Sequence, residues 1–173
     1  MDTLILLILA VLPALVIVAG LHDLTTMTIP NWISVLLIVT FFPVAFAVGL
    51  ELPAIAAHVG VALLALFIGA GMFALNWIGG GDAKLMAASC LWLGVTGSGM
   101  FLLWTGIAGG LFCLALIAGR FYARPYVMNG GAPGWIVQLM APKGDIPYGV
   151  AIAAGALMAF PSGDLMATFV SGL

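Results

Sequence analysis

Long apolar runs, separated only by short turns, constrain this chain more than any other feature of its sequence. The first run extends from Thr3 to Leu21 without a charged residue. Hydrophobic residues make up 65% of the 173 positions and charged residues 6%, as four Lys or Arg and six Asp or Glu. A soluble domain carries about 25% charged residues. This chain could not cover itself with a water-facing surface, so the sequence predicts an integral membrane protein.

Helices are expected for these runs, because a backbone in lipid must satisfy its own hydrogen bonds. The sequence predicts an all-α, polytopic membrane protein with six transmembrane helices, forming a single membrane-embedded domain over residues 1–173. The expected spans are Thr3–Leu21, Asn31–Leu50, Pro53–Ile78, Ala83–Val95, Met100–Gly119 and Pro147–Val170. The last is expected to bend or break near Pro161, because proline disrupts a helix interior.

The few charges predict an orientation. If six helices alternate, one side of the membrane receives the turns near 22–30 and 79–83 and the loop 120–146. All four cations fall on that side: Lys84, Arg120, Arg124 and Lys143. The other side receives Asp2, Glu51 and Asp164. The excess of Lys and Arg makes the first side cytoplasmic, so both termini are expected to be periplasmic.

Two carboxylates, Asp23 and Asp82, fall on the same cytoplasmic side in this topology. The helix after Asp82 has about 14 residues, or about 21 Å, against a hydrocarbon core of about 30 Å. Asp82 is therefore expected about 9 Å below the cytoplasmic edge. Two carboxylates that meet in such a recess cannot both ionise cheaply, so they are expected to share one proton. A pair of this kind can act as the general base and general acid of an aspartic protease without a metal or cofactor.

The residues around the pair suit supporting roles. Pro30 interrupts one helix and can open the next at its first turn. Three successive glycines favour an unwound connection that would admit a substrate strand. The supporting or substrate-binding candidates are Ile29, Pro30, Asn31, Gly79, Gly80, Gly81, Lys84, Pro147, Tyr148 and Gly149. For Lys84 alone, a cytoplasmic membrane anchor is the favoured interpretation.

The order of these motifs resembles the type IV prepilin peptidases. The matching elements are Asp23 followed by Ile29-Pro30-Asn31, then Gly79-Gly80-Gly81-Asp82 before Ala83-Lys84-Leu85, and finally Pro147-Tyr148-Gly149. The resemblance is closest to the short members that serve tight-adherence (Flp) pili. It implies an aspartic endopeptidase of the bacterial inner membrane, with Asp23 and Asp82 as catalytic residues of a GxGD-type site.

The same resemblance implies the partners. The expected substrates are prepilin and pseudopilin precursors, whose N-terminal leaders are cut at the cytoplasmic edge of the membrane. The long members of the family carry a cytoplasmic insertion with zinc-binding cysteines, linked to methylation. This chain has only Cys90 and Cys113, both within apolar spans, so neither a zinc insertion nor methyltransferase activity is expected. No metal or cofactor is expected, because the aspartic mechanism needs none, and no nucleic acid is expected, because the sequence has no basic patch.

Other interpretations of the same residues stay open. An intramembrane acid also marks ion paths in transporters and channels, and a noncatalytic subunit of a pilus or secretion machine would tolerate loss of its aspartates. Asp82 could cap the helix that follows it. Asp145 is a rival carboxylate on the cytoplasmic side, and it is expected to be solvent-exposed.

Overall fold

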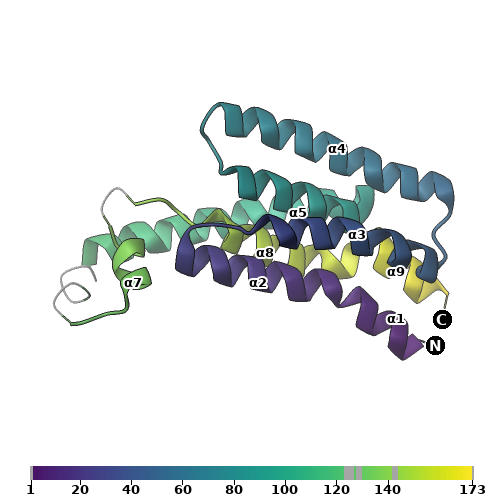
Figure 1. Cartoon of the computed structure of the whole chain (residues 1–173), viewed down its shortest axis with the longest axis horizontal. Coiled ribbons are helices and arrows are strands. Elements are labelled where there is room, and N and C mark those ends of the chain that lie inside the picture. The colour runs from purple at the N-terminus through teal and green to yellow at the C-terminus, as the bar shows by residue number, and fades with distance from the viewer. Residues whose placement is uncertain (1, 123–126, 128–129, 142–143, 173) are drawn as a thin grey trace.

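The computed structural model describes residues 2–122, 127, 130–141 and 144–172, and this part of the chain is helical with no strand. Figure 1 shows an elongated bundle whose N and C labels lie at the same end, with α7 at the other. The helices are α1 (Asp2–Leu9), α2 (Val11–Thr26), α3 (Asn31–Val48), α4 (Leu52–Ala74), α5 (Gly80–Tyr122), α7 (Gly134–Leu139), α8 (Tyr148–Ala159) and α9 (Asp164–Ser171), with a 3₁₀ turn at Phe160–Ser162. The all-α prediction is confirmed.

Helix α5 has 43 residues but is not straight. At Gly94 the backbone leaves helical geometry, with φ 72° and ψ −169°. The Ser98 hydroxyl donates to the carbonyl of Cys90 at 3.4 Å. Residues eight apart in a straight helix would be separated by about 12 Å along the axis. The chain therefore doubles back at Gly94, which divides α5 into a short limb (residues 80–93) and a long limb (residues 95–122).

Five helices of the described chain are long and apolar enough to cross a membrane: Thr3–Thr26, Asn31–Val48, Leu52–Ala74, Gly80–Tyr122 and Tyr148–Ser171. The prediction of six spans is not confirmed. That prediction treats the two limbs of α5 as separate spans. The short limb measures about 21 Å, which is less than the thickness of a hydrocarbon core. The periplasmic position of the termini stays a prediction.

Small residues let α8 pack at the centre of the bundle. Its buried positions are Gly149, Ala151, Ile152, Ala153, Gly155, Ala156 and Ala159. A methyl group added at Gly20 of α2 would lie 3.0 Å from the Cβ of Ala153. Such close contact is how helices associate in lipid, where van der Waals packing replaces the hydrophobic effect. The expected break at Pro161 is confirmed, since α8 ends at Ala159 and α9 begins at Asp164.

A polar cluster ties three helices together at the reversal. His58 of α4 is buried, and its Nδ1 lies 2.7 Å from the carbonyl oxygen of Leu91. A carbonyl can only accept, so Nδ1 carries the proton and donates. The Nε2 atom lies 4.0 Å from the Asp164 carboxylate, beyond hydrogen-bond distance, and that carboxylate accepts a hydrogen bond from the Thr96 N–H at 3.4 Å. This cluster fixes the far end of the short limb, opposite the end that begins at Gly80.

Candidate active site

Asp23 and Asp82 line one cavity of about 520 Å³. It opens where α2 ends, α5 begins and the chain enters α8, so three segments distant in sequence meet there. Its lining consists of Asp23, Met27, Asn76, Trp77, Ile78, Gly79, Asp82, Gly144, Asp145, Ile146, Pro147 and Tyr148. The structure thus brings the two predicted acids to one space.

Asp23 lies on the last turn of α2, which runs to Thr26 and so extends beyond the predicted end at Leu21. Its side chain is only 5% exposed. The carboxylate accepts the backbone N–H of Gly149 at 2.7 Å. Gly149 lies in the first turn of α8, where N–H groups have no partner within the helix and the helix dipole is positive. The start of α8 is therefore an electrostatic support for a charge on Asp23.

Asp82 lies in the first turn of α5, and its carboxylate accepts the backbone N–H of Gly79 at 3.0 Å. An acid near the helix start that bonds back to the residue before the helix is half of a capping box. Asp82 therefore caps α5 and still faces the cavity. The expectation of an unwound glycine run is wrong for Gly80 and Gly81, which belong to α5. The cap holds them in the first turn, and only Gly79 remains in the connection.

Ile29 packs between the two glycine segments. A methyl group added at Gly81 would lie 3.0 Å from the Ile29 Cβ, and one added at Gly149 would lie 2.9 Å from its Cδ1. Glycine at both positions lets the Ile29 side chain approach the starts of α5 and α8 closely. One apolar side chain therefore sets the spacing of the two helices that support Asp82 and Asp23.

Asn31 and Lys84 join the same segments through a polar contact. The Lys84 ammonium donates to the Asn31 side-chain oxygen at 2.9 Å. Pro30, expected in the first turn of α3, instead lies immediately before it, with φ −64° and ψ 135°, and Asn31 is the first helical residue. Lys84 therefore links the starts of α3 and α5, in addition to any interaction with lipid headgroups.

Pro147 and Tyr148 form part of the cavity wall, and their contact with a substrate stays a prediction. The wall also includes Asp145, which is exposed as expected and yet faces the same space as the catalytic candidates. Two predicted cytoplasmic cations, Arg124 and Lys143, lie outside the described residues.

Sequence reasoning missed Met27, Asn76, Trp77 and Ile78 as lining residues. Met27 and Asn76 have positive φ values of 56° and 58°. For Asn76 a signal existed, because asparagine tolerates the left-handed region better than most residues. For Met27 there was none. Its N–H bonds the Asp23 carbonyl at 2.8 Å, so its unusual backbone ends α2 one turn after the acid. Strained residues of this kind concentrate at functional sites.

The arrangement suits general acid–base chemistry on a backbone that enters the cavity. Each of the two carboxylates accepts one backbone N–H bond through its Oδ2, and within the described residues the Oδ1 of each has no hydrogen-bond partner. Within the part of the chain that the structure describes, no three His, Cys, Asp or Glu side chains gather as a metal site.

One comparison with known proteins gives a match. The family model of the type IV leader peptidase family matches residues 10–114. That range contains Asp23, Ile29-Pro30-Asn31 and the glycines before Asp82, and it ends before Pro147-Tyr148-Gly149. No curated protein and no solved structure matches the chain.

Proposed function

The chain belongs to the type IV leader peptidase family, and we propose that it is a prepilin leader peptidase that uses Asp23 and Asp82 as an aspartic pair. The observation that carries the proposal is the single cavity lined by both carboxylates. The reaction is endopeptidic removal of a short N-terminal leader from pilin and pseudopilin precursors, here those of a tight-adherence pilus.

The mechanism follows from a proton shared by the pair. The ionised aspartate takes a proton from a water molecule as that water attacks the scissile carbonyl carbon, and the protonated aspartate donates its hydrogen to the carbonyl oxygen. Collapse of the tetrahedral intermediate breaks the C–N bond and returns a proton to the leaving amine. The Gly149 N–H bond to Asp23 and the Gly79 N–H bond to Asp82 support this assignment, because they orient both carboxylates in the cavity.

The substrate enters as an extended strand at the inner membrane surface. Its own apolar helix lies in the bilayer beside the enzyme, which holds the scissile bond at the cytoplasmic edge. Gly79 and Gly144 line the cavity without side chains, so substrate backbone can pass close to them. In this proposal residues 1–173 act as one inner-membrane domain, residues 120–146 face the cytoplasm, and Pro147 and Tyr148 contact the strand.

The test is cleavage of a pilin-like precursor co-expressed with the protein and followed as a gel shift. Asp23→Asn and Asp82→Asn each keep the size of the side chain but remove its acid–base function, so each is expected to lower the rate by at least about 10³-fold. Glu51→Gln is the matched control, because this exposed carboxylate lies before α4 and outside the cavity lining.

The processing rates of the variants are compared at equal amounts of the protein in the membrane. If both asparagine variants process the precursor at the wild-type rate, the aspartic mechanism is refuted, and a noncatalytic role in pilus assembly becomes the better interpretation. Loss in the two aspartate variants with normal processing by Glu51→Gln supports the proposal.

A further inference from the structure

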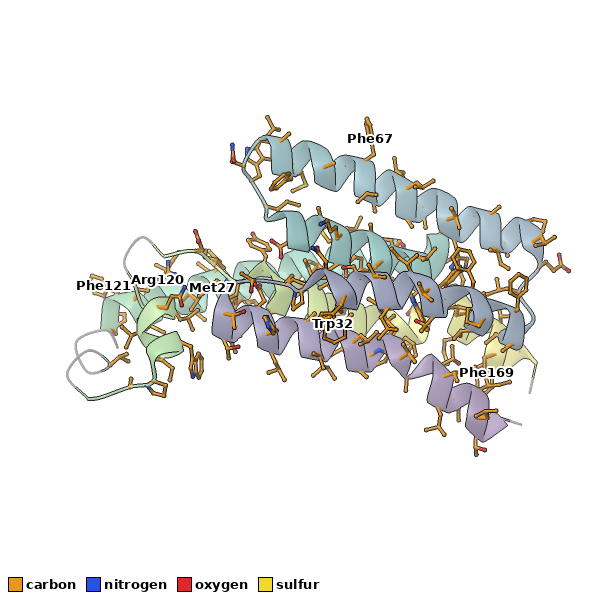
Figure 2. The ribbon with its side chains drawn as sticks, in the orientation of Figure 1. Met27, Trp32, Phe67, Arg120, Phe121 and Phe169 are labelled. Atoms are coloured by element: carbon orange, nitrogen blue, oxygen red, sulfur yellow. The ribbon has the colours of Figure 1, made fainter. Side chains whose placement is uncertain are left out.

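Arg120 makes contacts that a membrane anchor does not need. It lies in the last turn of α5 and is partly buried. Its Nε donates to the carbonyl oxygen of Leu139 at 2.9 Å, and its Nη2 donates to the carbonyl oxygen of Asp145 at 2.9 Å. In Figure 2, Arg120 lies at the same end of the molecule as Met27, a residue of the cavity lining.

These two carbonyl groups belong to the segment that becomes the cavity wall. Leu139 ends α7, and residues 144–148 line the cavity from one side. The Gly149 N–H that bonds Asp23 comes directly after them. The wall is thus held at one end by Arg120 of α5 and at the other end by Asp23 of α2.

From this geometry we propose that Arg120 is a positioning residue for the substrate cleft, a role that rests on the peptidase function proposed above. Arg120 fixes the wall at residues 144–148 and so sets the width of the space that a substrate strand must enter. It does not touch the reacting atoms.

The chemistry of the guanidinium favours this role over a purely electrostatic one. An arginine that only marks the cytoplasmic side would extend its charged end toward headgroups and water. Here the rigid fork of donors reaches two carbonyl groups on separate parts of one loop. A lysine keeps the charge but offers a single ammonium without the planar fork, so it cannot reproduce this geometry. Arg120→Lys therefore separates the two roles.

The expected kinetic effect lies mainly in substrate binding. Asp23 and Asp82 remain attached to α2 and α5 when the wall loosens, so their chemistry continues once a strand is bound. We expect Arg120→Lys to raise KM about tenfold and to change kcat by less than about threefold. Arg124→Gln, which removes a cation from the same predicted cytoplasmic loop, is the charge control and is expected to leave both constants near wild type.

A second readout does not depend on activity. Hydrogen exchange of purified protein in detergent should show faster exchange over residues 144–146 in Arg120→Lys, with unchanged exchange in α3 and in α8, whose Gly149 N–H supports Asp23. Wild-type KM and wild-type exchange in Arg120→Lys would overturn the proposal, because charge alone would then suffice. A fall in kcat with no change in KM would overturn it too. If the wild-type protein cleaves no precursor, the proposed function fails, whereas the exchange result still decides whether Arg120 holds the wall.

Discussion

A methyl group at Gly149 tests whether the start of α8 supports the catalytic pair. In Gly149→Ala the new Cβ would lie 2.8 Å from the Asp23 Oδ2, 2.9 Å from the Asp23 Cβ and 2.9 Å from the Ile29 Cδ1. Carbon atoms in contact prefer about 3.5 Å, so α8 or Asp23 must move by about 0.6 Å.

The size of the effect follows from that displacement. The Gly149 N–H bond to Asp23 is now 2.7 Å, and a shift of about 0.6 Å would stretch it to about 3.3 Å, beyond the usual range for N–H···O bonds. Loss of a hydrogen bond to a charged group costs about 1.5–3 kcal/mol. A displaced catalytic group can reduce the rate by about 100-fold. We therefore expect kcat/KM of Gly149→Ala to fall about 100-fold, or about 2.7 kcal/mol in activation free energy.

The assay is leader removal by purified enzyme in proteoliposomes, with thermal unfolding as a check that the variant folds. Gly106→Ala is the control, because a methyl group there has no neighbour within 4 Å. Combining Gly149→Ala with Ile29→Val removes only the contact with the Ile29 Cδ1, so the double variant should stay slow. Cleavage by Gly149→Ala within twofold of wild type would refute the reasoning. Full recovery in the double variant would mean that packing on Ile29, rather than contact with Asp23, causes the loss.

Two further substitutions test the supports at either end of the short limb. Lys84→Met removes the bond to Asn31 and is expected to lower kcat/KM about fivefold, because a hydrogen bond at this exposed contact contributes about 1 kcal/mol. Unchanged cleavage in the same liposome assay would contradict this. Gly94→Ala places a side chain at φ 72° against Asp164 and His58. It is expected to destabilise the fold by about 3 kcal/mol or more, seen as a lower unfolding temperature than that of the control Gly99→Ala, which has open space.

The meeting of the two acids could be predicted from the sequence because short motifs mark them. Asp23 and Asp82 stand out in a chain with six acidic residues, and the glycines and Ile29-Pro30-Asn31 lie beside them. The distribution of charged residues predicts both acids on one side of the membrane. In the structure both acids line the same cavity.

The supports of the site could not be predicted, because they come from packing between distant segments. The Gly149 N–H and the Asp23 carboxylate are 126 residues apart in sequence. The packing of Ile29 against Gly81 and Gly149 depends on where two later helices begin. The sequence predicts an orientation signal for Arg120, or at most a contact with acidic substrate residues, and no local pattern indicates that it bonds the carbonyl groups of Leu139 and Asp145.

The predicted helix boundaries differ from those in the structure for a similar reason. The periodicity of an apolar run does not say where a helix ends, so the extension of α2 to Thr26 depended on the left-handed backbone of Met27. The reversal within α5 was expected as a turn between Val95 and Met100, and the structure has it at Gly94, where His58 and Asp164 leave room only for glycine.

The limb that carries Asp82 is short and lies almost wholly inside the helical bundle, where Ala83, Leu85 and every position from Ala87 to Gly94 are buried. Between Gly80 and the bend at Gly94 it measures about 21 Å, which is less than the thickness of a hydrocarbon core. The position of Asp82 along the bundle is therefore set by contacts within the protein, from the bend at Gly94 back to the start of α5, rather than by the thickness of the surrounding lipid.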